Sequence, residues 1–458
     1  MTKLWGGRFD SKDMDPSVMK FTSSLDVDKI LAGYDCAGSR AHAEMLERSG
    51  YITRSETEAI ISALDGFMKE FETGKVDLGK HEDIHSAIQS YVEEKAPAAA
   101  KKMHTGRSRN EQVVSDVRLY CKDAVDMIVG LVRILQKGLT DLAERNSGTI
   151  IPGYTHLNRA QPVLFAHLIM SYVEMLERDA GRLIDARGRC DISVMGSGAL
   201  AGSALDLDRK FVAEKLGFSA VSANSIDSVS DRDFIVELVS ALSIAAVHLS
   251  RISEDFILYS IPEFGFLEIG EAYCTGSSLM PQKKNADVLE LIRGRSAQMI
   301  SALNALLILL KGLPHSYNRD LQEDKKYLFE SVELAASLFS IMTALVGTIK
   351  LNEKKVREIL NDEFIYATDL AEYLVRKGVA FKDAHLAVGG MVKRCIADGI
   401  SISDLSITEI KSFSEKFDED IYGYLNPETS IEMKKTLGST NPVLVKKEIA
   451  AWKKKLGR

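Results

Sequence analysis

The chain has 458 residues, a formal net charge of −7 and 45% hydrophobic residues. This length predicts two or three domains, and the interspersed charges argue against a nucleic-acid partner. Five scattered cysteines without a C-x-x-C pair argue against a disulfide framework or a zinc ribbon and fit a reducing cytosol. The first residues lack an apolar signal core, and no uninterrupted apolar run reaches membrane-spanning length, so we expect a cytoplasmic protein without a membrane partner.

Residues 1–106 are expected to form an N-terminal helical domain. Val27–Gly50 and Ser55–Thr73 have the periodicity of amphipathic helices, and Ser55–Glu58 resembles a capping box. Helical periodicity is common along the whole chain, strand-like alternation is scarce, and only 9 prolines occur. The predicted fold class is therefore all-α.

A literal H-E-x-x-H sequence lies at His81–His85. On a helix, its two histidines would share one face and could bind zinc. A catalytic zinc also needs a third protein ligand and an apolar helix around the pair, whereas Lys80 and Asp83 flank this one. We therefore expect no metal here, although the polar cluster could bind another ligand.

Residues 107–355 are expected to form a central domain of five helices longer than the usual three turns. The first predicted helix follows the polar loop His104–Asn110 and runs toward Arg145. The other four are expected near Pro162–Arg187, Phe234–Tyr259, Ala286–Lys311 and Asp324–Leu351. Some are apolar around most of their circumference, as at Ala241–Val247, and need neighbours on all sides. Because one chain supplies few such neighbours, we expect oligomerisation through these helices. After them the helices shorten, and residues 356–458 are expected to form a third, small helical domain.

The glycine-rich segment Gly196–Gly202 is similar to a dinucleotide-binding fingerprint. That motif requires a preceding strand, a βαβ unit and a downstream acidic residue. Because the surrounding sequence is helical, we interpret the segment as a flexible loop of small residues.

Four polar clusters suited to anions lie where long helices begin. They are Arg107–Asn110, Thr155–Gln161, Gly276–Asn285 and Tyr317–Lys325. In Gly276–Asn285, Gly and Pro interrupt the helical pattern, and two hydroxyls and two lysines precede Asn285, a predicted N-cap. Each cluster alone could be a solvated helix cap or connection. If the four converge, they form one site for a multiply anionic substrate.

The sequence of Gly276–Asn285, GSSLMPQKKN, resembles the signature of the fumarase/aspartase superfamily, and the chain as a whole resembles the argininosuccinate lyase family within it. The supporting blocks are Leu4–Phe9, Glu82–His85, His104–Asn110, Gly153–Pro162, Gly196–Gly202, Ser230–Phe234 and Tyr317–Lys325. The resemblance implies a cofactor-free carbon–nitrogen lyase of arginine biosynthesis that splits argininosuccinate into arginine and fumarate. It also implies three mostly helical domains, a homotetramer with a 20-helix core, and active sites shared between subunits.

The resemblance further implies a role for each residue in these blocks. Ser277 would be the general base on a mobile loop, helped by Lys283 and Asn285. His156, paired with Glu290, would lie on the leaving-group side, either as a direct acid or in a water-mediated relay. The remaining expected substrate contacts are Ser24, Asp28, Ser108, Arg109, Asn110, Thr155, Gln161, Arg232, Tyr317, Gln322 and Lys325.

Two alternatives stay open at the level of sequence. One is a sibling fumarate-releasing lyase of the adenylosuccinate or fumarase type, and the other is a non-enzymatic structural protein like the δ-crystallins. Intact Ser277, Lys283, His156 and Glu290 argue against the structural role, and the His104–Asn110 block favours argininosuccinate.

The chain departs from the family's usual pattern at a few positions. Ala286 stands where proline is usual, and Glu111 stands where aspartate is common. Further departures are Gln89, Val194 and Leu205–Leu207. None of them removes an expected catalytic position, although Ala286 loosens the geometry at the loop-to-helix junction.

Overall fold

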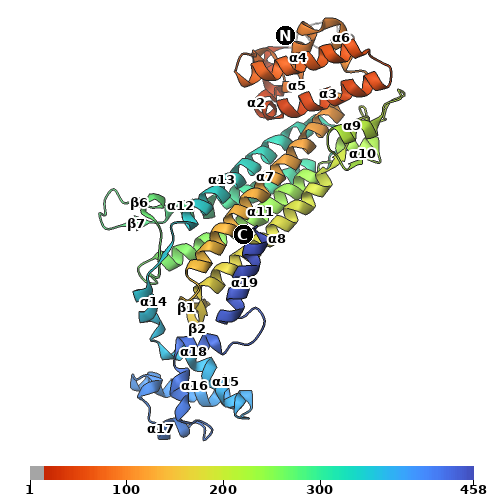
Figure 1. The fold of residues 1–458 in the computed structure, drawn as a ribbon. Coiled ribbons are helices and arrows are strands. Elements are labelled where there is room, and N and C mark those ends of the chain that lie inside the picture. Colours follow the sequence, from red (N-terminus) through yellow and green to blue (C-terminus); the bar gives the residue numbers. More distant parts are fainter. Residues whose placement is uncertain (1–14, 458) are drawn as a thin grey trace. The chain divides into compact units, whose positions relative to one another are not determined.

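The computed structural model describes residues 15–457 and is predominantly helical (Figure 1). The predicted block Leu4–Phe9 lies outside these residues. The chain divides into two compact units. Unit 1 comprises residues up to Gly130, Asp179–Ala246 and Ala297–Ala336, and unit 2 comprises Leu131–Arg178, Val247–Ser296 and the residues from Ser337 onward.

The five long helices expected from the apolar periodicity are present, and the all-α class is confirmed. They are α7 (Arg109–Arg145), α8 (Phe165–Cys190), α11 (Asp233–Ser260), α12 (Asp287–Leu310) and α13 (Asp324–Val346). The apolar positions that predicted α7 are buried, from Val117 and Val125 to Leu139 and Leu142. Each boundary between the two units falls inside one of these helices. This division differs from the three consecutive domains that the sequence predicts. Those three domains stay a prediction.

The N-terminal part of unit 1 is a set of helices of up to 19 residues that pack on one another. They are α1 (Pro16–Thr22), α2 (Leu25–Asp28), η1 (Lys29–Leu31), α3 (Ala32–Arg48), α4 (Arg54–Glu72), η2 (Leu78–Lys80), α5 (Ile84–Lys95) and α6 (Pro97–Met103). The segment predicted as a helix at Val27–Gly50 is helical up to Arg48, with a 3-10 turn at Lys29–Leu31. The predicted capping box is wrong by two positions, because Thr53 caps α4 and exchanges hydrogen bonds with Glu56.

The rest of unit 1 includes short elements between the long helices. They are β3 (Ile192–Ser193), α9 (Arg209–Lys215), β4 (Ala220–Val221), α10 (Ser225–Ser230) and η4 (Arg319–Glu323). The glycine-rich segment forms a turn after β3, with φ of 86° at Gly196 and 62° at Gly198. Because β3 and β4 contain only two residues each, the segment is a loop and not part of a dinucleotide-binding βαβ unit.

Unit 2 contains a β-hairpin that the sequence analysis missed. Strands β1 (Ile150–Thr155) and β2 (Asn158–Leu164) pair antiparallel, and α8 begins only after them. Two further pairs are β5 (Leu267–Glu268) with β8 (Lys350–Leu351) and β6 (Thr275–Gly276) with β7 (Lys284–Asn285); η3 (Glu271–Tyr273) precedes β6. The predicted N-cap role of Asn285 is wrong, because this residue pairs with Thr275 and α12 begins at Asp287.

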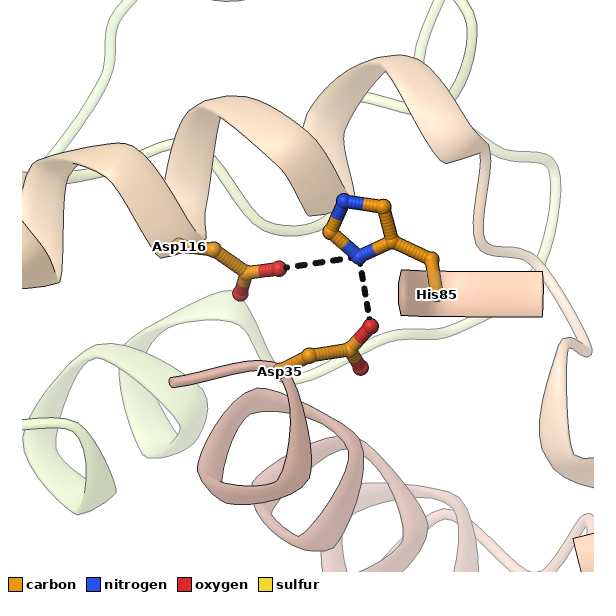
Figure 2. A group of neighbouring side chains, drawn as sticks. All are labelled: Asp35, His85 and Asp116. Atoms are coloured by element: carbon orange, nitrogen blue, oxygen red, sulfur yellow. Dashed lines mark hydrogen bonds and ion pairs between the residues drawn. The ribbon is translucent and has the colours of Figure 1, made fainter. Parts of the chain in front are cut away.

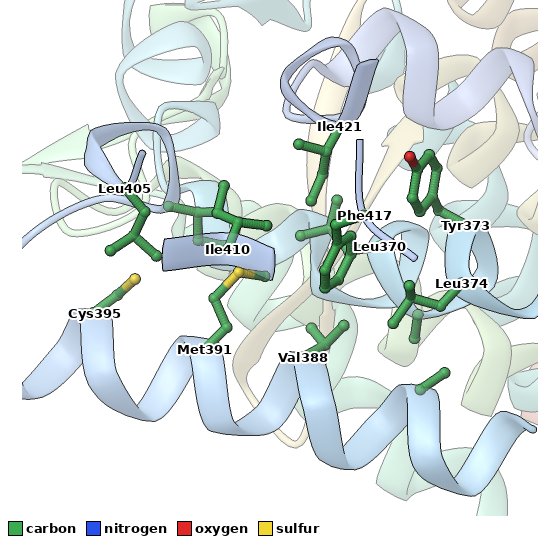
Figure 3. Close-up of a cluster of buried hydrophobic side chains, with 13 residues drawn as sticks. Leu370, Tyr373, Leu374, Val388, Met391, Cys395, Leu405, Ile410, Phe417 and Ile421 are labelled. Carbon is green, nitrogen blue, oxygen red and sulfur yellow. The ribbon is translucent and has the colours of Figure 1, made fainter. Parts of the chain in front are cut away.

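The C-terminal part of unit 2 has a hydrophobic core of its own, which includes Leu370, Val388, Met391 and Phe417 (Figure 3). Its elements are α14 (Glu353–Leu360), η5 (Glu363–Tyr366), α15 (Ala367–Arg376), α16 (Phe381–Asp398), η6 (Ile402–Asp404), α17 (Ile407–Lys411), η7 (Glu419–Tyr424), α18 (Pro427–Glu432) and α19 (Pro442–Lys455). Helix α17 ends before Phe417, the predicted limit. The small third domain predicted at residues 356–458 stays a prediction, because these residues belong to the larger unit 2.

Two helical segments, Asp233–Ser260 and Arg319–Val346, are long and apolar enough to cross a membrane by length and composition alone. Their most apolar windows are 56% and 50% buried inside the protein. The core helices of soluble proteins pass the same test, so these segments are weak evidence for a membrane span.

Candidate active site

The H-E-x-x-H sequence does not form the helical pair that a zinc protease uses. His81 follows η2, Asp83 caps the N-terminus of α5, and His85 lies in the first turn of α5. His85 is buried and contacts two buried carboxylates, Asp35 and Asp116 (Figure 2). The ligand atoms of these three residues lie close enough together to hold a metal ion.

The geometry of this group fits a direct hydrogen bond better than a metal. His85 Nδ1 lies 2.6 Å from Asp35 Oδ2 and 3.4 Å from Asp116 Oδ2. Two ligands bound to one tetrahedral zinc at about 2.1 Å would stand roughly 3.4 Å apart, so the 2.6 Å contact leaves no place for the ion between these two atoms. Burial acts to raise the pKa of Asp35, but the His85 hydrogen bond and the charges of His85, Arg107 and Arg109 outweigh it and lower that pKa. We therefore interpret the group as a buried ion-paired network.

This network extends to Arg109, one of the expected substrate contacts at the start of α7. The side-chain amide of Gln112 donates through Nε2, which lies 2.9 Å from both carboxylate oxygens of Asp35. Arg109 in turn donates to Gln112 Oε1 at 2.9 Å and to Ser86 Oγ at 3.3 Å. The guanidinium is thus fixed before any ligand arrives, which is the condition for efficient recognition of a carboxylate.

A second group of expected contacts meets in unit 1, between α2 and the start of α13. Ser24 Oγ donates to Asp28, and Lys325 Nζ lies 3.6 Å from Asp28 Oδ1 and donates to the Gln322 carbonyl at 3.1 Å. Gln322 donates to the Thr22 carbonyl at 3.1 Å. The Gln322–Thr22 and Lys325–Asp28 contacts join residues about 300 positions apart, so the structure brings together residues that the sequence could only propose separately.

Arg232 is also buried beside this group and pairs with Asp324. Asp28 and Lys325 are buried as well. Within one chain, Arg232, Asp28 and Lys325 thus form ion pairs and hydrogen bonds with their neighbours. Tyr317 is half-buried, and its side chain makes no hydrogen bond within residues 15–457. Their assignment as substrate contacts stays a prediction.

In unit 2, the tip of the β1–β2 hairpin carries His156. His156 and Leu157 have φ of 54° and 58°, the left-handed conformation that non-glycine residues rarely adopt. This two-residue turn joins Thr155 to its partner Asn158 and projects His156 into solvent, while Gln161 lies further along β2. Such strain concentrates at functional sites, which makes the turn a candidate for chemistry.

The segment between β6 and β7 in unit 2 carries Ser277 and Lys283. Ser277 Oγ accepts hydrogen bonds from the backbone N–H groups of Leu279 at 3.2 Å and Met280 at 3.0 Å. Serine hydroxyls commonly accept such bonds from backbone N–H groups two and three residues further along the chain, so the role of Ser277 as base stays a prediction. Lys283 is exposed, and Lys284 instead donates to the Ile269 carbonyl at 2.7 Å.

Among the residues that the structure describes, no hydrogen bond or ion pair joins His156 to Glu290, and both side chains are exposed. This pairing therefore stays a prediction. Conversely, the sequence analysis missed Asp35 and Gln112 as supports for Arg109. The spacing of Arg109 and Gln112, three residues apart on a helix, is the signal that could have indicated their contact.

Comparison with known proteins agrees with these features. Residues 7–301 match the protein-family model described as Lyase, and residues 364–432 match the one described as Argininosuccinate lyase C-terminal. Argininosuccinate lyase of Pelotomaculum thermopropionicum is 47% identical over 96% of each chain, and that of Desulforudis audaxviator is 45% identical over 100% of each. The solved structure of EDDS lyase in complex with formate has the same fold, with a TM-score of 0.83 at 24% identity over 96% of this chain and 88% of that one.

Proposed function

Because the chain belongs to the argininosuccinate lyase family, we propose that it is a carbon–nitrogen lyase that splits argininosuccinate into arginine and fumarate. The observation that carries this proposal is the similarity to argininosuccinate lyases over the full length, at 45–47% identity. The same similarity supports a place in arginine biosynthesis and a cytoplasmic location.

The reaction is a reversible β-elimination. A base removes a weakly acidic proton from the carbon beside a carboxylate, and fixed donors and cations stabilise the enolate-like carboxylate that forms. The carbon–nitrogen bond then breaks, fumarate forms, and the guanidinium of arginine leaves. No step requires a metal or an organic cofactor.

We assign the base to Ser277, whose Oγ already accepts two backbone N–H groups. A serine is a weak base at neutral pH unless neighbouring groups stabilise its alkoxide. The ammonium group of Lys283 and the positive end of α12 would add to these donors when the loop closes over substrate. Asn285, which precedes α12, would hold the substrate carboxylate.

We assign the leaving-group side to His156 with Glu290, and the substrate contacts to the residues named from the family resemblance. Arg109 is the best supported of these contacts, because Gln112 and Ser86 fix its guanidinium. The proton reaches the leaving nitrogen from His156 either directly or through water.

We also propose a homotetramer in which each active site takes residues from several subunits. Support comes from α12, whose apolar side chains Leu291, Ile300, Leu307 and Ile308 are exposed in the isolated chain. Apolar surface of this kind on a long helix is typical of an oligomer interface. Analytical ultracentrifugation should find a species of about four times the 50.5 kDa chain mass.

The activity is tested by following fumarate absorbance with argininosuccinate, adenylosuccinate and malate as separate substrates. We expect fumarate from argininosuccinate only. Turnover of adenylosuccinate or malate alone would identify a sibling lyase. Silence with all three substrates from a tetrameric protein would favour the structural role and overturn the proposal.

A further inference from the structure

A fully buried carboxylate at the start of α7, Glu111, has no part in the proposed chemistry. Its Oε1 accepts the backbone N–H of Ser108 at 3.0 Å, and its Oε2 accepts the backbone N–H of Gly198 at 3.0 Å. Burial raises the pKa of Glu111, while these two N–H groups act in the opposite direction. One side chain therefore joins two loops that are far apart in the sequence.

A second hydrogen bond joins the same two loops. Asn110 Nδ2 donates to the Ala199 carbonyl at 3.1 Å, and the Asn110 backbone N–H donates to Ser108 Oγ at 3.3 Å. The turn Ser108–Asn110, which carries three expected substrate contacts, is thus attached to the glycine-rich loop Gly196–Gly202 by both a carboxylate and an amide.

The glycine-rich loop is itself held in one conformation. Arg209 donates to the Met195 carbonyl at 2.8 Å and to Ser197 Oγ at 3.3 Å. A Cβ atom at Gly196 would lie 2.5 Å from Arg209 Cγ, and one at Gly198 would lie 2.7 Å from the Gly202 carbonyl oxygen. Only glycine fits at these two positions, so the N–H of Gly198 is aimed at Glu111 by a rigid support.

We propose that Glu111 is a positioning residue for substrate, which transmits the fixed geometry of the glycine-rich loop to the substrate-binding turn Ser108–Asn110. This inference rests on the proposed function. A simple helix-capping role would have a different consequence, because a cap stabilises the protein without changing substrate affinity. A positioning role changes KM, since it sets the donors that meet substrate in both the ground state and the transition state.

The discriminating experiment compares Glu111→Gln with Glu56→Gln. Glu56 is a matched control, because it accepts the backbone N–H of Thr53 at 2.8 Å in the capping box of α4, where no substrate contact is expected. In Glu111→Gln, the amide keeps the shape of the side chain but places an NH2 group against one of the two N–H donors. We expect both variants to lower Tm, and only Glu111→Gln to raise KM, by about tenfold with kcat within about threefold.

A second pair of variants reaches the same contact from its other side. Gly198→Ala should displace the N–H that Glu111 accepts, and should raise KM by about fivefold. Gly74→Ala is its control, because Gly74 also has a positive φ, of 67°, but has open space around it. This pair decides the question if Glu111→Gln fails to fold.

The outcomes separate the two proposals. Wild-type protein without activity on argininosuccinate would overturn the proposed function and this inference with it. An active wild type whose KM is unchanged in Glu111→Gln and Gly198→Ala would overturn the positioning role alone. An equal rise of KM in Glu56→Gln would also overturn it, because the effect would then be a general consequence of lost stability.

Discussion

The two polar loops that the sequence analysis joined in one site differ sharply in how the structure holds them. The turn Ser108–Asn110 rests on buried partners, with Glu111, Gln112 and the glycine-rich loop Gly196–Gly202 all hydrogen-bonded to it or to Arg109. The segment from Ser277 to Lys283 is bounded by a two-residue strand on each side, and most of its side chains are exposed. One loop is held by buried partners, and the other is largely exposed.

We propose that this difference corresponds to a division between substrate recognition in the first loop and proton transfer in the second. Pre-organised donors bind a carboxylate without an ordering cost. A loop that carries the base can instead exclude water only after substrate has bound. Substitutions in the two loops should therefore differ in their effects on stability and on rate.

The largest expected effect is the loss of turnover in Ser277→Ala. Removal of the proposed general base should lower kcat by about 10³-fold or more. Because the loop is exposed, Tm and the oligomeric state should not change. Fumarate absorbance gives the rate, and ultracentrifugation gives the assembly.

Ser278→Ala is the matched control for this variant. Ser278 is the next residue and carries an exposed hydroxyl, and its loss should leave kcat within about threefold of wild type. Near-normal activity of Ser277→Ala would rule out Ser277 as the base and would remove the chemical role from the exposed loop.

The sequence predicted more of the long-helix core than of the site. Apolar periodicity located α7, α11 and α12 to within about two residues of their ends, because burial of one helix face is a local pattern. It missed the β1–β2 hairpin, since the turn there consists of His156 and Leu157 in a conformation usually marked by glycine or asparagine.

The site was predicted as a set of residues and not as a geometry. The Gly276–Asn285 and His104–Asn110 blocks were identified by resemblance. The partners that hold Arg109, such as Asp35, lie far away in the sequence, and no local pattern indicates such a contact. The same reason explains why the role of Glu111 emerged only from the structure.

The second prediction tests closure of the exposed loop. Leu279 lies two residues after Ser277 and is 84% exposed. If closure buries this side chain, Leu279→Ser removes about 1–2 kcal/mol of apolar burial from the closed form only, equivalent to about 5–30-fold in kcat/KM. Tm should change by less than about 1 °C, since exposed substitutions cost little stability.

Leu437→Ser is the control for this loop variant, because Leu437 is 94% exposed and lies outside the expected site. It should leave both Tm and kcat/KM unchanged. Equal kcat/KM for wild type and Leu279→Ser would show that this side chain stays exposed throughout the reaction, and the two loops would then differ less in function than in structure.

The smallest expected effect concerns the protonation of His42 and its influence on the stability of the folded protein. His42 is buried and donates through Nε2 to the Thr105 carbonyl at 3.0 Å. Burial and the charge of Arg107 lower the pKa of His42 to about 3. The unfolded chain, with a histidine pKa of about 6.5, therefore binds a proton between about pH 6.5 and 3 that the folded chain does not bind. Stability should fall as the pH falls through this window.

His42→Gln separates this contribution from that of other titrating groups. The amide can still donate to Thr105 but binds no proton, so the variant should lose about 1 kcal/mol less stability than wild type per pH unit between pH 6 and 5. Urea unfolding at each pH measures this slope, and His385→Gln, on an exposed position of α16, should keep the wild-type slope. A slope in His42→Gln equal to that of wild type would mean that His42 already binds its proton in the folded protein. The region around Thr105 would then hold a charged histidine in the folded protein. The turn Ser108–Asn110 and the Ser277 loop would still differ in exposure, but the proposed difference in rigidity would lose this support.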